Sequence, residues 1–308
     1  IGQQTHTVYS RAEGKDTAKQ DFDLLVQQNG DILSAGRTVA DELARKSDDG
    51  NFDASDVYRG YYAADQLQNM LNSYEKGSAD AQLVQAQIEN LNRAVSAGQS
   101  KNAQALSAGR WAQIDEYTPI RKFEQITQRK VNDFAETRGG KQLESLASDV
   151  VEMAKSGPQD KEFTAFLKAQ GVDVGDNPLN AQMDDLAKRI KRMADTKGIK
   201  TTDEQAKSAA ASILAGGNAD DVFNAMARKS LGIENLSQED YDYVKNAFAE
   251  MADMPDSKAR YEKELDAYKR LTKYMPAKTF GDKMESIRYL SMLGNTRTHA
   301  RNVLGNVS

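Results

Sequence analysis

Apolar residues recur at steps of three and four along most of this chain, the spacing that places side chains on one face of an α-helix. The first stretch with this pattern begins near Asp16 and runs to Leu43. Later stretches repeat it, and none alternates convincingly in the manner of a β-strand. The pattern predicts an all-α fold, an elongated bundle of roughly twelve helices with no significant sheet.

Glycine, proline and polar runs divide this pattern into separate helices. A polar run at 46–51 ends the first stretch, and Gly77-Ser78 separates the next two. The later helices are bounded mainly by glycine pairs, by prolines and by cap residues. Beyond the first stretch, the predicted helices are 54–76, 79–97, 118–138, 143–155, 160–170, 179–196, 206–215, 219–231, 241–251 and 256–274.

Three of these helices carry recognisable start signals. Thr118 stands before Pro119, which predicts threonine as the cap and proline in the first turn. Thr201 and Glu204 have the spacing of a capping box, in which each side chain bonds to the other residue's backbone amide. Ser237 is predicted to cap the helix that follows it.

The same boundaries suggest how the chain is organised. We expect a flexible tether at 1–15, an N-terminal helical bundle at 16–157, a second helical segment at 158–278 and a closing two-helix motif at 279–308. The sequence LSAGR occurs at 33–37 and again at 106–110. Its small residues would allow two helices to approach closely. The repetition is either a duplicated hairpin or a coincidence in an alanine-rich chain.

The composition of the chain excludes some kinds of functional site and leaves others open. The chain has no cysteine, which excludes disulfides, thiolate metal sites and cysteine nucleophiles. It shows no signal peptide and no apolar window long enough to span a membrane, which is consistent with a cytoplasmic location. The net charge of -5 is uneven, because residues 256–308 carry 11 Lys and Arg against 6 Asp and Glu. This basic C-terminal region could face phosphate or an acidic partner.

Motifs for metals, nucleotides and catalysis are weak. Residues 49–55 imitate the start of a calcium loop, but Ala54 and Gly60 stand where the turn glycine and the bidentate glutamate belong. Asp53 or Ser55 is better interpreted as a cap of the next helix. The two histidines, at positions 6 and 299, have no histidine at helical spacing, and no phosphate-binding glycine motif occurs. The sequence therefore predicts no metal, no cofactor and no assigned catalytic residue.

Two basic clusters are the candidate binding sites. One is a polar group near the end of the chain, in which two arginines four residues apart share a helix face; the other is a basic run in a helix. Either cluster could bind an anion or a nucleic-acid backbone, or could instead pair with acidic residues on a solvated helix face. The residues are Arg297, His299, Arg301 and Asn302 in the first cluster, and Lys188, Arg189, Lys191 and Arg192 in the second.

Two stretches carry a family resemblance. They read LSAGRWAQIDEYTPIRKFEQITQRKVN at 106–132 and FGDKMESIRYLSMLGNTRTHARNVLGN at 280–306. Both resemble segments of the polyvalent proteins of phages and conjugative elements, large multi-domain chains thought to enter the host with the DNA. In that family, segments of this kind form helical connecting regions. The chain begins at Ile1 rather than Met and ends directly after a motif, so we expect a piece of a longer polypeptide. The resemblance implies other domains of the same chain or phage proteins as partners, and a cytoplasmic or virion-associated location.

Together these observations favour a non-catalytic helical scaffold or interaction module that is translocated or packaged with DNA. An alternative is a nucleic-acid-binding module that uses the basic C-terminal region. A second alternative is a hydrolase or nuclease that uses His299, the histidine of the closing motif.

Overall fold

The structure is a computed structural model that describes residues 11–101, 116–156, 169, 178–255 and 257–276. These residues form eleven α-helices and one 3-10 helix, with no strand among them, so the predicted all-α fold is confirmed. The helices are α1 (Arg11–Asn29), α2 (Ile32–Asp48), α3 (Ala54–Leu71), α4 (Ala79–Lys101), α5 (Thr118–Ala135), α6 (Arg138–Ser156), α8 (Pro178–Thr196), α9 (Asp203–Leu214), α10 (Ala219–Leu231), α11 (Gln238–Ala252), α12 (Lys258–Leu271) and the 3-10 helix η1 (Thr272–Tyr274).

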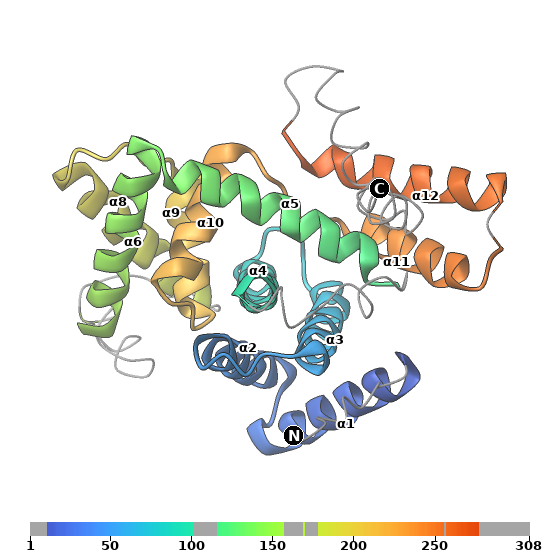
Figure 1. The fold of residues 1–308 in the computed structure, drawn as a ribbon. Helices are drawn as coiled ribbons and strands as arrows, with labels where there is room; N and C mark the ends of the chain where they lie inside the picture. The colour runs from blue at the N-terminus through green and yellow to red at the C-terminus, as the bar shows by residue number, and fades with distance from the viewer. Residues whose placement is uncertain (1–10, 102–115, 157–168, 170–177, 256, 277–308) are drawn as a thin grey trace, which may run out of the picture.

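Helix α4 lies in the middle of the molecule, and the other helices are arranged around it (Figure 1). Helices α2 and α3 pack along one side of α4, and α1 packs against both of them. Helix α5 crosses the opposite side and connects the two ends of the structure. At one end of α5 stand α6, α8, α9 and α10, and at the other the α11–α12 hairpin.

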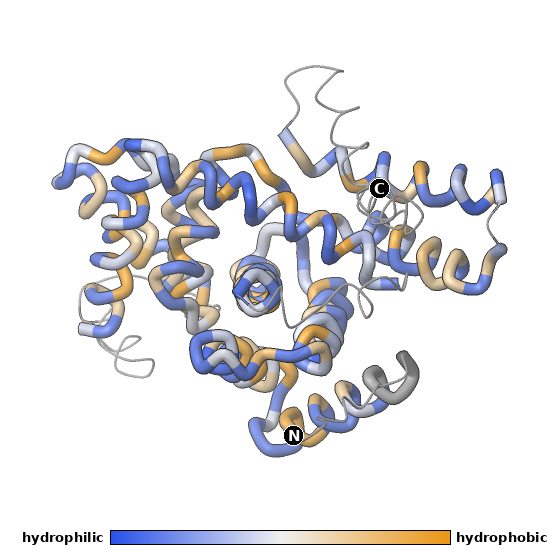
Figure 2. The backbone as a smooth tube through the Cα atoms, in the orientation of Figure 1, coloured by the Kyte–Doolittle hydropathy of each residue, from blue (hydrophilic) through white to orange (hydrophobic). Residues whose placement is uncertain are grey.

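Two main hydrophobic cores share α4. The larger core joins α2, α3 and α4 to the start of α5 and to the α11–α12 hairpin, with Leu91, Phe123 and Phe248 among its fully buried side chains. The smaller core joins α6, α8, α9 and α10 to alanines on another side of α4. Apolar and polar segments alternate along the helices in Figure 2, as expected where each helix buries one face.

Both cores combine residues from either side of position 157, the predicted end of the N-terminal bundle. Helix α6 precedes this position and packs with α8 to α10, which follow it. Helices α11 and α12 follow it and pack with α3, α4 and α5. Residues close together in sequence are therefore distributed between two cores that α4 and α5 connect.

The first helical stretch is two helices rather than one. Helix α1 ends at Asn29, and Gly30 adopts φ 87°, a left-handed conformation that favours glycine. Asp31 then caps α2, its carboxylate accepting from the Ser34 amide at 2.8 Å. The prediction followed the apolar spacing across the break and missed the Gly-Asp pair.

Of the predicted caps, two are confirmed, one lies a residue later than predicted, and one is wrong. Asp53 caps α3 and Ser237 caps α11, as expected. The capping box of α9 lies one residue later than predicted and joins Thr202 to Gln205. Helix α5 has no side-chain cap, because Tyr117 takes the cap position and Thr118 is already helical.

Close helix packing requires glycine at Gly60. A Cβ atom there would lie 2.2 Å from Cγ2 of Val95 on α4 and 3.0 Å from Leu43 on α2. Both neighbours are side chains of the larger core, with almost no exposed surface. Gly60 therefore sets the distance at which α3 meets the central helix.

Candidate functional sites

The basic run of α8 is divided between paired and exposed side chains. Arg189 pairs with Asp185 one turn earlier at 2.6 Å, and Lys191 forms an ion pair with Asp203 at the start of α9. Lys188 and Arg192 are exposed and lie four residues apart, on one helix face. Half of the predicted cluster is thus engaged by acidic side chains of the described fold.

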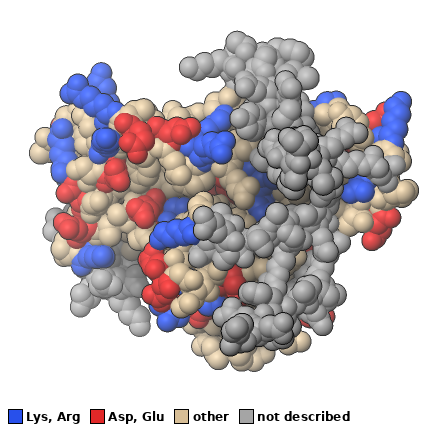
Figure 3. All heavy atoms as spheres, viewed as in Figure 1, with Lys and Arg blue, Asp and Glu red and all other residues tan. Residues whose placement is uncertain are grey.

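The exposed half has acidic neighbours on the same helix. Asp184 and Asp195 are also exposed, before and after Lys188 and Arg192 along α8. On the face of the molecule seen in Figure 3, Lys and Arg are interspersed with Asp and Glu over the described surface. This mixture weakens the positive potential that a phosphate backbone would meet at α8.

The closing cluster Arg297, His299, Arg301 and Asn302 lies outside the described residues, and so does the second LSAGR sequence at 106–110. The first LSAGR sequence lies on α2, and its glycine, Gly36, faces α3. A Cβ atom at Gly36 would lie 2.9 Å from Cδ1 of Leu67. The predicted close helix approach is therefore present in this copy.

Arg37, the last residue of this LSAGR copy, reaches α9. Its Nε donates to the carbonyl of Ala215 at 3.1 Å, and its Nη2 donates to the carbonyl of Leu214 at 2.9 Å. These carbonyls belong to the last turn of α9 and its C-cap, where the helix itself supplies no donors. Gly216 follows with φ 87°, and a Cβ atom there would lie 2.7 Å from Arg37 Nε.

Arg93 of α4 holds the other side of the same turn. Its guanidinium forms an ion pair with Asp221 and approaches Asn218 at 3.5 Å. Asn218 and Asp221 form the capping box of α10. Arg37 and Arg93, which we call the arginine clasp, thus fix the turn between α9 and α10 to the two helices α2 and α4.

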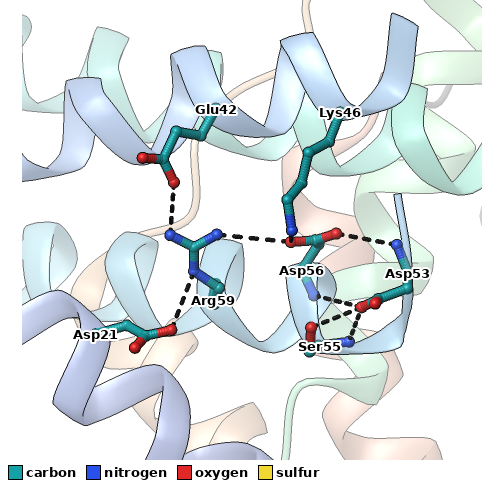
Figure 4. A network of polar contacts seen from close by, with 7 residues as sticks. All are labelled: Asp21, Glu42, Lys46, Asp53, Ser55, Asp56 and Arg59. Atoms are coloured by element: carbon teal, nitrogen blue, oxygen red, sulfur yellow. Dashed lines mark hydrogen bonds and ion pairs between the residues drawn. The ribbon is translucent and has the colours of Figure 1, made fainter. Parts of the chain in front are cut away.

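A second polar network ties the N-terminal helices together (Figure 4). Asp56 of α3 has no exposed surface and accepts from Lys46 of α2 at 2.6 Å and from the backbone amide of Asp53 at 3.0 Å. Arg59 lies 3.6 Å from Asp56 and also pairs with Glu42 of α2 at 2.6 Å and with Asp21 of α1 at 3.5 Å. The charged side chains of this network are thus paired with one another inside the fold.

The calcium-like loop is part of this network. The Asp53 carboxylate accepts from the backbone amides of Ser55 and Asp56 and from the Ser55 hydroxyl. Burial opposes its charged form, but these hydrogen bonds prevail and lower the pKa of Asp53. In the part of the chain that the structure describes, no group of three or more His, Asp or Glu side chains is arranged to hold a metal ion.

A third polar group attaches the α11–α12 hairpin. Asp65 of α3 accepts from Lys245 at 2.5 Å and from the Tyr241 hydroxyl at 3.3 Å, both on α11. Burial, followed by the charge of Asp65, raises the pKa of Tyr241 well above its usual value. On α5, Lys122 donates to the buried hydroxyl of Tyr268 of α12 at 2.8 Å. Sequence reasoning missed these contacts, because the partners lie 146 or more residues apart.

A shallow surface depression of about 610 Å³ lies between the start of α6 and the turn after α8. Its cationic side chains are Arg138, Lys141 and Lys197. Lys197 forms an ion pair with Asp149, and Lys141 lies 3.9 Å from Glu136. These acidic partners offset much of the positive charge, so the depression has the character of a mixed polar surface.

No described helix combines the length and the apolar character that crossing a bilayer requires. A scan of protein-family models and searches of curated proteins and of solved structures find no match to this chain.

Proposed function

We propose that this chain is a non-catalytic helical scaffold of a phage or mobile-element polyvalent protein, packaged or translocated with DNA. On this proposal it lies in the cytoplasm or the virion and holds neighbouring domains of the same polypeptide, or phage proteins, in fixed positions. The family context rests on the resemblance of residues 106–132 and 280–306. The scaffold role rests on how the described fold uses its charged side chains.

The observation that supports the scaffold role is that the buried polar contacts join one helix of the fold to another. Asp56, Asp65 and Arg93 each join helices that are distant in sequence or separated by a loop. Such contacts fix helix positions, and a charge already satisfied inside the fold is poorly placed to bind a ligand. The proposal explains why these networks connect α1 to α3, α4 to α10 and α3 to α11.

Nucleic-acid binding is the first rival, and a titration separates it from the scaffold role. Fluorescence anisotropy with labelled duplex and single-stranded DNA would be measured over a range of salt concentrations. The scaffold proposal predicts binding no tighter than about 10⁻⁴–10⁻⁶ M, the usual range for non-specific contacts. Tighter binding that weakens steeply with salt would overturn it.

Matched variants locate any such binding. Arg297→Ala with Arg301→Ala tests the closing cluster, and Lys188→Ala with Arg192→Ala tests the exposed face of α8. Lys19→Ala with Lys76→Ala is the control, because both lysines are exposed and lie outside α8 and outside the basic region 256–308. Loss of tight binding in either test pair, with the control unchanged, would support the nucleic-acid role.

A hydrolase or nuclease that uses His299 is the second rival. The scaffold proposal predicts no turnover of nucleic-acid or phosphodiester substrates by the chain. Turnover that disappears in His299→Ala, with folding intact by circular dichroism, would contradict it.

A further inference from the structure

The segment that follows α12 folds back onto the start of α11. It consists of η1 and the two residues after it, Met275 and Pro276. The carbonyl of Tyr274 in η1 accepts from the backbone amide of Glu234 at 3.1 Å, in the loop between α10 and α11. Met275 is buried in the larger core. The chain that leaves α12 is thus held against the loop that precedes α11.

Asp240, the third residue of α11, is at the centre of this contact, and its side chain is only 10% exposed. One carboxylate oxygen accepts from Arg270 of α12 at 3.0 Å. The other accepts from the Tyr274 hydroxyl at 2.7 Å and from Lys273 at 3.5 Å, both on η1. One carboxylate therefore ties α12 and η1 to α11. We call Asp240, Arg270, Lys273 and Tyr274 the Asp240 strap.

Further contacts hold Arg270 in place within the strap. Its guanidinium carbon lies 3.6 Å from the centre of the Tyr243 ring, a stacking geometry that favours a cation. The Tyr243 hydroxyl in turn donates to Asp266 of α12 at 2.5 Å. The exposed Glu239 lies 3.8 Å from Arg270 and adds a weaker attraction. The guanidinium is therefore fixed from two helices.

The charge of Asp240 keeps the strap closed at neutral pH. Burial opposes the charged form, but hydrogen bonds from Tyr274 and Arg270 and the charge of Lys273 prevail and lower the pKa of Asp240 below its usual 3.8. A lowered native pKa means that the contribution of Asp240 is present above 3.8 and is lost as pH falls through the native pKa. The contact is thus a permanent fastening near neutral pH.

We propose that the Asp240 strap fixes the direction in which the chain leaves α12, with Asp240 as its positioning residue. This inference rests on the proposed function, because a scaffold orients a following domain only if the chain leaves it in a fixed direction. It deepens that function by naming the side chains that set the direction.

Spin labels test the strap. One cysteine pair joins Thr196 of α8 to Pro276, and a reference pair joins Thr196 to Glu262 on α12, all at exposed positions. Pulsed electron–electron double resonance should give narrow distance distributions for both pairs in the otherwise unchanged chain. Asp240→Asn should broaden the distribution of the Thr196–Pro276 pair and leave that of the reference pair narrow. An equally narrow Thr196–Pro276 distribution in Asp240→Asn would overturn the proposal.

Asp242→Asn is the matched control. Asp242 lies two residues further along α11 and accepts from Gln238 of the same helix at 2.9 Å, so both distributions should stay narrow. The two pairs also separate the strap from the scaffold role. A broad Thr196–Pro276 distribution alone, before any substitution in the strap, would overturn the strap and leave the scaffold standing. Broad distributions for both pairs would contradict both.

Hydrogen exchange tests the strap without labels. The Glu234 amide donates to the Tyr274 carbonyl, so its protection reports the closed strap. Asp240→Asn should speed exchange at this amide about 10- to 100-fold, the factor that corresponds to losing a hydrogen bond to a charged group. Tyr274→Phe removes one donor and leaves Asp240 in place, so it should speed exchange less. Unchanged exchange in a folded Asp240→Asn variant would overturn the proposal.

Discussion

Asp56 shows what burial requires of a charged side chain in this protein. The carboxylate is fully buried and is satisfied by Lys46, by Arg59 and by the backbone of its own capping box. Removing one member of a buried ion pair leaves the other charge without a partner, and this loss exceeds that of an exposed pair. The stability of the α1–α3 region should therefore depend on this residue.

Asp56→Ala should lower the free energy of unfolding by about 1–3 kcal/mol, because the capping box loses an acceptor and Lys46, whose side chain is 34% exposed, loses its buried partner. The measurement is urea denaturation followed by circular dichroism. Asp133→Ala, at an exposed position of α5, is the matched control and should change stability by less than about 0.5 kcal/mol. Equal effects of the two substitutions would refute the structural role of Asp56.

The buried carboxyl group of Glu124 should make the stability of the protein depend on pH. Burial raises its pKa above the usual 4.5, although Arg228 of α10 lies 3.3 Å away and acts in the opposite direction. A raised native pKa means that the folded state holds the proton more tightly than the unfolded state does. The contribution of Glu124 to stability is therefore present at acid pH and is lost as pH rises through its native pKa.

Glu124→Gln should remove this dependence. Relative to the wild type, the variant should become progressively more stable as pH rises from below 4.5 through the native pKa. Urea denaturation at a series of pH values measures the difference, with the exposed Glu144→Gln as the control. A difference that stays constant or reverses would show that Arg228 outweighs burial.

At the scale of helices, sequence patterns located most elements and many of their ends. Residues 219–231 were predicted as a helix with the bounds that α10 has in the structure. Errors arose where two local signals competed, as at Thr201 and Thr202, which are both suitable caps. Apolar periodicity also continued across Gly30, so one uninterrupted helical stretch was predicted where the structure has two helices. Local sequence preference alone does not decide which of two adjacent residues caps a helix, or whether a helix ends at a glycine.

The central position of α4 was not predicted from the sequence, although the composition of this helix contains a signal for it. Between residues 81 and 100 this helix has only two charged side chains, Glu89 and Arg93, which is typical of a helix surrounded by others. The partners of Arg93 could not be predicted, because Asp221 lies 128 positions away in the sequence. The basic run of α8 was predicted from the sequence as a candidate site, whereas its pairing with Asp185 and Asp203 became visible only in the fold.

Gly60→Ala should destabilise the protein by about 1–3 kcal/mol, because the added methyl group overlaps Val95 and forces α3 away from α4. Thermal and urea unfolding would measure the change. Gly139→Ala on α6 is the control: its added methyl group meets no atom closer than 3.9 Å, so stability should stay the same or rise by at most about 1 kcal/mol. A neutral Gly60→Ala would contradict the close contact between α3 and α4.

At the scale of the whole molecule, two cores share one central helix and are connected by buried polar contacts. The arginine clasp, the Asp65 contacts and the crossing helix α5 each restrict movement of one part against another. A scaffold requires this property, because neighbouring domains keep their arrangement only if the module between them is rigid. Rigidity is thus the central physical requirement of the proposed function.

Distances between spin labels test this requirement most directly. The chain has no cysteine, so pairs of cysteines can be introduced at Gln20 on α1, Thr196 on α8 and Glu262 on α12, which are all exposed. Pulsed electron–electron double resonance should give a single narrow distance distribution for each pair, unchanged by salt or by added DNA. Broad or multiple distributions, or distances that shift when DNA is added, would contradict the scaffold account.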